Sequence, residues 1–245
     1  MEKITLEKYK GILKSTNLRV FIFDFDGTLL DVNKPLERSI QETFEENNIE
    51  INLNKTKKEI GRVLESIQGL PFPKIILRSY EISNSLSSLQ NLSYFKRLQI
   101  AAKLFAKYFD YEKDSLLISK AKELLEKLSS EYDIFVVSNN QSKNLYHHIE
   151  EKKIGKYFKG VYGADDLTSL KPDPLSLHPI LTQYPLLERK QFVIIGDMPT
   201  DIEAGKRAGI WTIGITSGIS NKELLSEQEP DLIVDSLSSL GKIFK

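Results

Sequence analysis

Two aspartates that stand two positions apart are the residues with the clearest capacity for chemistry. Asp24 and Asp26 follow the apolar run 20–23, which is typical of a strand buried on both faces. Because side chains alternate along a strand, the two carboxylates tend to project to the same side at its carboxyl end. Neighbouring carboxylates repel each other, and a divalent cation that prefers oxygen ligands, such as Mg²⁺, supplies the missing positive charge.

Gly27 and Thr28 extend this stretch with groups that suit an anion. The glycine gives the backbone freedom to turn, and the threonine adds a hydroxyl beside backbone amides. An aspartate-rich turn after a strand is the simpler explanation, since Asp and Gly are common turn residues. The rest of the chain favours chemistry over a plain turn.

Three further polar sites follow other apolar runs, at Ser138 and Asn139, at Lys171, and at Asp197 and Asp201. Each has an ordinary structural explanation: a helix cap, a solvated lysine, or acidic side chains at a helix N-terminus. Those explanations, taken one at a time, do not explain why all four sites lie at strand ends or in the loops directly after them. A parallel sheet brings such strand ends to one crevice, where open α/β sheets place their ligands. We therefore expect the four sites to meet there.

The elements that must position these sites are short apolar strands that alternate with helices. Strands are predicted at 20–23, 134–137, 160–163, 192–195, 211–216 and 232–234. Helices are predicted at 116–129, 142–153, 175–184 and 201–209, although Pro179 argues against the full length of the third. This alternation is typical of an α/β fold with a doubly wound parallel sheet.

A stretch of helical periodicity interrupts that alternation after the first strand. Helices are predicted there at 35–47, 55–68, 74–83 and 91–109, and a short polar helix is predicted before Arg19. We therefore expect a core domain made of residues 1–31 and 115–245. Residues 32–114 are expected to form a smaller, inserted α-helical domain.

Composition argues against several classes of partner and chemistry. The 245 residues include 34 basic and 34 acidic side chains, which gives no electrostatic reason to expect binding to nucleic acid or to an anionic membrane. The absence of cysteine rules out disulfides, thiolate zinc sites and a cysteine nucleophile. His147 and His148 are adjacent, not at metal-ligand spacing, and are expected on a helix surface. The sequence has neither the pattern of a signal peptide nor a membrane-spanning run, so we expect a cytoplasmic protein. We expect it to be a monomer or a homodimer.

In their order along the chain, the four sites resemble the motifs of the haloacid dehalogenase superfamily. The matching segments are Asp24-Phe25-Asp26-Gly27-Thr28, Ser138-Asn139, Lys171-Pro172 and Gly196-Asp197-Met198-Pro199-Thr200-Asp201. The helical insertion resembles the cap domain of the phosphoglycolate phosphatase-like and β-phosphoglucomutase-like branches. The resemblance implies a Mg²⁺-dependent phosphatase that hydrolyses a small-molecule phosphomonoester, such as a phosphoglycolate-like compound or a sugar phosphate.

The resemblance also implies which residues react and which hold the metal. Asp24 would attack phosphorus and form an aspartyl-phosphate, which divides hydrolysis into two steps. Asp26 would protonate the leaving oxygen and then deprotonate the attacking water. Mg²⁺ would be held by the Asp24 carboxylate, the Asp26 backbone carbonyl and Asp197.

The remaining motif residues would bind the transferred group or support the residues that do. The phosphoryl oxygens would be held by the Ser138 hydroxyl together with groups from Gly27, Thr28 and Asn139. Lys171 would bind the transferred group and neutralise charge on it and on Asp24. Asp201 would orient metal-bound water or Lys171 without itself binding the ion or the substrate.

Several other functions share parts of this pattern. A phosphomutase of the β-phosphoglucomutase type has the same motifs, and a pyrophosphatase lies within the phosphatase class. A haloacid dehalogenase proper needs neither Mg²⁺ nor an acid/base aspartate at the second position, so Asp26 argues against it. A non-catalytic binding protein is least expected, because carboxylates gathered without a function destabilise a fold. Arg62, Lys74 and Arg78 could contact an acidic substrate, although such residues are more often simply solvated.

Overall fold

The computed structural model of the chain describes residues 17–67 and 86–244. The chain divides into two compact units: Met1–Leu30 with Leu117–Lys245, and Asp31–Leu116. The helix predicted before Arg19 falls largely outside the described residues, and the helix predicted at 74–83 lies wholly outside them. Lys74, Arg78 and the side chain of Arg62 are outside them as well.

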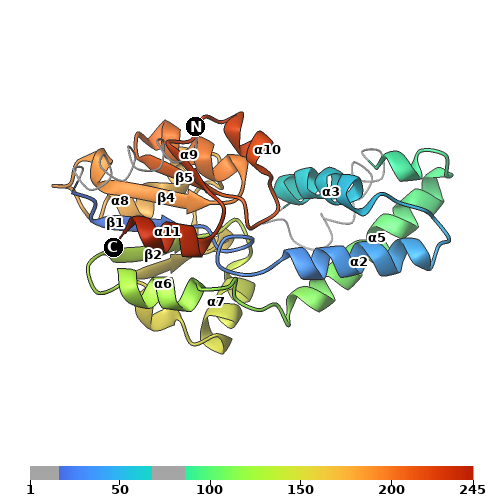
Figure 1. The fold of residues 1–245 in the computed structure, drawn as a ribbon, viewed down its shortest axis with the longest axis horizontal. Helices are drawn as coiled ribbons and strands as arrows, with labels where there is room; N and C mark the ends of the chain where they lie inside the picture. The colour runs from blue at the N-terminus through green and yellow to red at the C-terminus, as the bar shows by residue number, and fades with distance from the viewer. Residues whose placement is uncertain (1–16, 68–85, 245) are drawn as a thin grey trace. The chain divides into compact units, whose positions relative to one another are not determined.

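The first unit is built on a six-stranded parallel sheet (Figure 1). Its strands are β1 (Val20–Phe23), β2 (Asp133–Val137), β3 (Gly160–Tyr162), β4 (Phe192–Gly196), β5 (Trp211–Ile215) and β6 (Leu232–Val234). They lie in the order β3-β2-β1-β4-β5-β6, so the first strand of the sequence occupies the interior of the sheet. Each neighbouring pair is parallel, which confirms the predicted fold class.

Helices and short 3-10 turns connect these strands. The helices are α6 (Ala121–Leu128), α7 (Ser142–Glu151), α8 (His178–Leu181), α9 (Pro199–Ala208), α10 (Lys222–Ser226) and α11 (Leu237–Ile243). The 3-10 turns are η2 (Gly155–Tyr157), η3 (Ala164–Asp166), η4 (Pro174–Leu177) and η5 (Arg189–Gln191). The sequence pattern gives no prediction for α10 and α11, which are only five and seven residues long.

Both faces of β1 are buried, and each face packs on different helices (Figure 1). Val20 and Ile22 belong to an apolar cluster that includes residues of β2, β4, α8 and α9. On the other face, the ring of Phe21 lies 4.7 Å from that of Tyr132 and 4.9 Å from that of Phe244, centroid to centroid. These two rings follow α6 and α11 in the chain. Helices on both faces explain why every residue of this strand is apolar.

The register of β1 sets the edge at which the polar sites leave the sheet. Phe23 pairs with Val136 of β2 and with Ile195 of β4. The backbone N–H of Asp24 donates to the Ile195 carbonyl at 2.8 Å, so the ladder extends one residue beyond the strand. The segments that follow β1, β2 and β4 therefore begin at the same carboxyl edge.

Two predicted helices of this unit have different limits in the structure. The helix predicted at 116–129 begins only at Ala121, because the backbone N–H of Ile118 donates to the Leu29 carbonyl at 2.8 Å and ties this segment to the loop after β1. The helix predicted at 175–184 is divided into η4 and α8. Pro179 has no backbone N–H and fits only the first turn of a helix, so α8 begins at His178.

The prediction that both adjacent histidines lie on a helix surface is wrong for His148. This side chain is 1% exposed, and its ring centroid lies 6.2 Å from that of Phe25. Consecutive residues of an α-helix are rotated by about 100°, so His147 is exposed while its neighbour is buried in the core.

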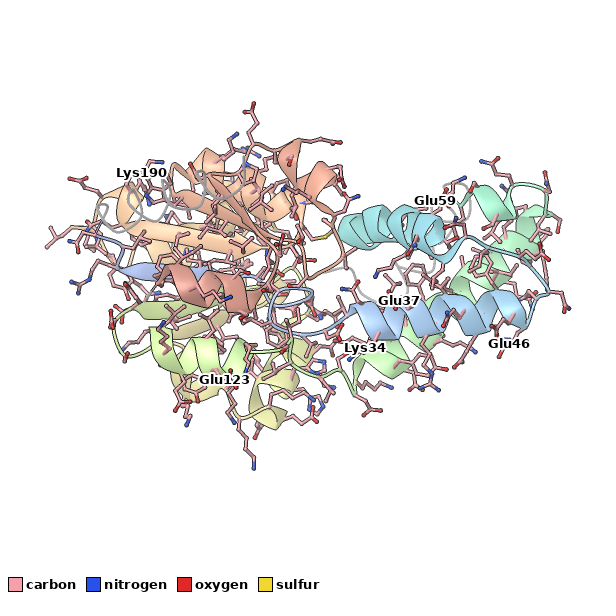
Figure 2. All side chains as sticks on the ribbon, in the orientation of Figure 1. Lys34, Glu37, Glu46, Glu59, Glu123 and Lys190 are labelled. Atoms are coloured by element: carbon pink, nitrogen blue, oxygen red, sulfur yellow. The ribbon has the colours of Figure 1, made fainter. Side chains whose placement is uncertain are left out.

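The second unit consists of helices joined by turns and irregular segments, with no strand among its described residues. It contains α2 (Asn33–Glu45), α3 (Leu53–Ile67), η1 (Ser87–Leu89) and α5 (Tyr94–Glu112), and α2 packs against both α3 and α5 (Figure 1). Ion pairs connect these helices at the surface. Glu37 accepts from Lys57 at 2.6 Å, and Glu46, labelled with it in Figure 2, lies 2.6 Å from Lys103 and 2.9 Å from Lys107. Across 17–67 and 86–244, no helix has the length and apolar character needed to cross a bilayer.

Candidate active site

Lys171 lies between two carboxylates at the carboxyl edge of the sheet. Its Nζ is 2.6 Å from Asp24 Oδ1 and 2.6 Å from Asp201 Oδ1, and it donates to the Val137 carbonyl at 2.9 Å. These three acceptors match the three N–H donors of an ammonium group. Burial lowers the pKa of Lys171, but the charges of Asp201 and Asp24 outweigh this effect and hold the pKa above its ordinary value. The lysine is therefore a buried, fixed positive charge.

The backbone of Lys171 is held by Asn139, which follows β2. Asn139 Oδ1 accepts from the Lys171 N–H at 2.9 Å, and Asn139 Nδ2 donates to the Lys171 carbonyl at 2.9 Å. Both residues are buried. Their two hydrogen bonds fix the loop after β3 against the loop after β2, and so they place the ammonium group beside Asp24.

Asp24 has one carboxylate oxygen occupied and the other available. Oδ1 accepts from Lys171, whereas Oδ2 is buried and accepts no hydrogen bond from any residue that the structure describes. Burial raises the pKa of Asp24 to about 7; Lys171 opposes this shift, and the charges of Asp201 and Asp26 add to it. A buried carboxylate oxygen without a partner is costly unless a cation or a ligand occupies the position beside it.

Asp197, the first residue after β4, lies close to the loop after β5 and to the turn after β1. Its Oδ2 accepts from the Ile219 N–H at 2.7 Å, and its Oδ1 accepts from the Thr28 hydroxyl at 3.3 Å. A Cβ added to Gly218 would lie 2.1 Å from Oδ2, and one added to Gly27 would lie 2.3 Å from the same atom. A Cβ at either position would require Asp197 or the adjacent backbone to shift, so the two glycines permit the present close approach of this carboxylate.

Three buried carboxylates lie close enough together to hold a divalent cation. One oxygen each from Asp24, Asp197 and Asp201 lies within 4.8 Å of the others. Burial raises the pKa of Asp197 well above its ordinary value, and the charges of Asp24 and Asp201 raise it further. Asp201 Oδ1 accepts from Lys171 at 2.6 Å and Asp201 Oδ2 accepts from the Met198 N–H at 3.0 Å, so both oxygens of this carboxylate, like both oxygens of Asp197, already have donors. An all-oxygen, anionic donor set with the unpartnered Asp24 Oδ2 fits a hard cation such as Mg²⁺.

Asp26 is in contact with the residues that follow β2. Its Oδ2 accepts from the Ser138 hydroxyl at 3.1 Å, and its Oδ1 accepts from Asn140 Nδ2 at 3.4 Å. Asp26 and Ser138 are 5% and 1% exposed, so these contacts are shielded from solvent. Asn140 is a site residue that the sequence analysis does not single out, although it follows Ser138 and Asn139 directly.

The structure thus brings together the residues of the four motif segments, and several of them have partners within the protein. Gly27, with φ +86°, donates its N–H to the Leu30 carbonyl at 2.9 Å within the turn after β1. Thr28 contacts Asp197, and Asn139 contacts Lys171. Two positions that the sequence analysis misses, Gly218 and the Ile219 amide, lie in the loop after β5, where neither residue type by itself indicates a functional site.

Comparison with known proteins gives a consistent family relationship. The family model described as haloacid dehalogenase-like hydrolase matches residues 21–215. A phosphoglycolate phosphatase of Vibrio parahaemolyticus serotype O3:K6 is 28% identical over 231 residues, which cover 93% of this chain and 96% of the relative. The similarity therefore extends over both units, beyond the motif segments alone.

Solved structures share the fold at lower identity. A crystal structure described as a predicted phosphoglycolate phosphatase from Haemophilus somnus 129PT aligns with a TM-score of 0.70 and 24% identity, covering 94% of this chain and 99% of that one. A Bacillus subtilis structure described as a putative haloacid dehalogenase (HAD) hydrolase bound to magnesium aligns with a TM-score of 0.66 and 21% identity, covering 94% of this chain and 99% of that one. Each of these structures resembles the present chain over nearly its whole length.

Proposed function

The chain belongs to the haloacid dehalogenase-like hydrolase family, and from this premise we propose that it is a phosphatase that hydrolyses a small-molecule phosphate monoester through a covalent aspartyl-phosphate. The observation that carries the proposal is the state of Asp24. One of its carboxylate oxygens is neutralised by Lys171 at 2.6 Å, and the other is buried without a partner in the described part of the chain. A carboxylate held in this way is a suitable nucleophile for phosphorus.

In the first step, an Asp24 oxygen forms a bond to phosphorus while the bond from phosphorus to the ester oxygen breaks. Asp26, in its protonated form, gives its proton to the departing oxygen, so the organic product leaves as an alcohol. The nearness of Asp26 to Ser138 and Asn140 supports this role, because these contacts hold the carboxyl group in a defined orientation.

In the second step, Asp26 is a carboxylate and takes a proton from a water molecule. The water oxygen bonds to phosphorus and the bond from phosphorus to Asp24 breaks, which releases inorganic phosphate. Asp24 is thereby restored as a carboxylate and Asp26 as an acid, so the two residues are ready for another cycle.

Negative charge on the transferred phosphoryl group is met by fixed positive charge and hydrogen-bond donors. Lys171 supplies a buried ammonium group, and its contacts to Asn139 and Asp201 hold it in position. We propose that the Ser138 hydroxyl, which donates to Asp26 in the structure, donates to a phosphoryl oxygen when substrate is bound.

We propose Mg²⁺ as the cofactor, held by the Asp24 carboxylate, the Asp26 backbone carbonyl and Asp197. When bound, the ion would neutralise the charges that otherwise keep the carboxylate nucleophile and the anionic substrate apart. The carboxylates of Asp24 and Asp197 support this choice, because both are buried and an oxygen of each lies within 4.8 Å of an oxygen of the other. Anionic oxygen ligands are those that Mg²⁺ prefers. The Ile219 amide and the Thr28 hydroxyl would keep Asp197 oriented toward the ion.

The helical unit is proposed to act as a cap domain that selects the substrate. Relatives of the chain in two Vibrio species are named phosphoglycolate phosphatases, which favours a small acidic phosphate ester over a nucleotide or a phosphoprotein. A sugar phosphate is the other compound class that we propose. We propose residues 1–31 and 115–245 as the core domain and residues 32–114 as the cap domain.

The test is phosphate release from a panel of phosphoglycolate, sugar phosphates, nucleotides, pyrophosphate and an aryl phosphate, with and without Mg²⁺. We expect Mg²⁺-dependent release with the highest kcat/KM for a small phosphomonoester. Accumulation of an isomerised sugar phosphate, with activation by a sugar bisphosphate, would instead identify a mutase. Release from none of these compounds would contradict the proposed function.

A further inference from the structure

Asn140 has a side-chain orientation that its own backbone surroundings determine. Its Oδ1 accepts from the Gln141 N–H at 2.8 Å, and an N–H group can bond only to the oxygen of an amide side chain. Its backbone carbonyl accepts from the Ala164 N–H at 2.8 Å, which ties this residue to the segment after β3. The NH₂ end of the side chain must therefore face away from Gln141, and it is this end that reaches Asp26.

The two oxygens of Asp26 receive different donors. Asn140 Nδ2 lies 3.4 Å from Oδ1, and the Ser138 hydroxyl lies 3.1 Å from Oδ2. The backbone N–H of Asn140 also donates to the Ser138 oxygen at 3.0 Å, so one residue contacts both the carboxylate and the hydroxyl. All three residues follow β1 or β2 at the same edge of the sheet, where neighbouring backbone limits their movement.

Given the proposed function, on which this step rests, we propose that Asn140 is a positioning residue that holds the carboxyl group of Asp26 in the orientation needed for proton transfer. An amide NH₂ group is a donor, and an oxygen of Asp26 can accept from it whether the carboxyl group is ionised or carries its proton on the other oxygen. The contact from Asn140 Nδ2 to Asp26 Oδ1 can therefore persist when the Ser138 hydroxyl turns from Asp26 to the phosphoryl group.

Asn140 keeps its own orientation through that exchange. The Ser138 hydroxyl has a single proton and cannot donate to Asp26 and to a phosphoryl oxygen at the same time. The side-chain amide of Asn140 is held by the Gln141 N–H, and its backbone carbonyl is held by the Ala164 N–H. Asp26 is therefore still oriented at the moment when its proton is needed.

The test compares substrates that need a general acid with substrates that do not. An alkyl phosphate has a poor leaving group that must be protonated, whereas 4-nitrophenyl phosphate has a leaving group that departs as an anion. Asn140→Asp keeps the acceptor for the Gln141 N–H and removes the donor to Asp26, and Asn140→Ala removes both. Asn144→Ala, in the first turn of α7, is the matched control.

For both Asn140 variants, we expect kcat/KM for alkyl phosphates to fall by about ten- to hundredfold, while kcat/KM for 4-nitrophenyl phosphate changes by less than about threefold. KM for the alkyl substrate should change little, because the residue acts on proton transfer and not on phosphoryl binding. Asn144→Ala should match the wild type on both substrates. The melting temperature of each variant, measured in parallel, shows whether the protein assayed is folded.

Suppose that the wild type is active and Asn140→Asp is folded. An equal loss of kcat/KM on both substrate classes in this variant would then overturn the role of Asn140 and leave the proposed function intact. Unchanged kcat/KM on both classes would overturn it as well. If the wild type releases phosphate from neither class, the proposed function fails first, and the role of Asn140 fails with it. The separate behaviour of wild type and variants thus distinguishes the two failures.

Discussion

Asn139 and Lys171 exchange two hydrogen bonds of 2.9 Å, although they lie 32 residues apart in the sequence. The side chain of one residue binds both backbone polar groups of the other, in the manner of a paired strand. The ammonium group of Lys171 then reaches Asp24 and Asp201 at 2.6 Å. Asn139 therefore helps to position the Lys171 ammonium group through the Lys171 backbone. These two hydrogen bonds involve neither Asp24 nor Asp201.

We predict that Asn139→Ala destabilises the protein through the backbone of Lys171. Removal of the amide leaves a buried N–H and a buried carbonyl without their partner, and each such group costs about 1–3 kcal/mol. Urea unfolding should therefore give a free energy of unfolding lower by about 2–5 kcal/mol than that of the wild type. Asn144→Ala serves as the control for loss of an asparagine side chain. A change below about 0.5 kcal/mol in Asn139→Ala would show that this pair is not structural.

Gly218→Ala should weaken Mg²⁺ binding by displacing Asp197. The added Cβ would lie 2.1 Å from Asp197 Oδ2, a distance that forces the carboxylate or the loop after β5 to move. We expect the Kd for Mg²⁺, measured by isothermal titration calorimetry, to rise by about tenfold or more. Gly155→Ala is the matched control, because its Cβ would meet Ile149 at an ordinary 3.4 Å. Equal affinity in the two variants would exclude a role for the close approach of Gly218.

The stabilisation that Mg²⁺ gives should increase with pH. Burial raises the pKa of Asp24 from 3.8 to about 7 in the metal-free protein. Between pH 3.8 and about pH 7, Asp24 is ionised in the unfolded chain but still protonated in the folded chain. The free energy of unfolding of the metal-free protein therefore decreases as pH rises through this range. A cation favours the ionised form and offsets this loss.

The rise in Tm on adding Mg²⁺ should accordingly be larger at about pH 8 than at about pH 5.5. Differential scanning calorimetry of the wild type and of Asp24→Asn checks this expectation. The variant has no carboxyl group to ionise at this position, so its response to Mg²⁺ should be smaller and less dependent on pH. A rise in Tm that is the same at both pH values in the wild type would contradict the account of Asp24.

In the helical unit, Glu42 should contribute stability that is lost in acid. Hydrogen bonds from Lys107, Tyr111 and Arg38, in this order of effect, lower the pKa of Glu42 from 4.5 to about 2. A carboxyl group whose pKa is lowered by folding stabilises the fold above its unfolded pKa, and it loses this effect as pH falls through the folded value. Glu42→Gln should therefore have a lower Tm than the wild type near neutral pH, and the difference should shrink from about pH 4.5 toward pH 2. A difference that does not vary with pH would show that the ionised carboxylate is not responsible.

The sheet and the meeting of the four sites could be predicted because each rests on a local pattern. The apolar run Val20 to Phe23 is typical of a strand covered on both faces in a parallel sheet, and Asp24 follows at its carboxyl end. The partners of these side chains could not be predicted. The contact of Asn140 with Asp26, and that of the Ile219 amide with Asp197, depend on where loops distant in sequence meet. Likewise, His148 is buried because of the face of α7 on which it lies, a fact that the residue type does not reveal.

The covalent aspartyl-phosphate on Asp24 tests the central claim most directly. The wild type, quenched with acid during turnover of its best substrate, would be digested and analysed by mass spectrometry. We predict that the peptide containing Asp24 gains the mass of one phosphoryl group, and that Asp24→Asn shows neither this gain nor phosphate release. Phosphate release by Asp24→Asn at a rate near that of the wild type would contradict the account.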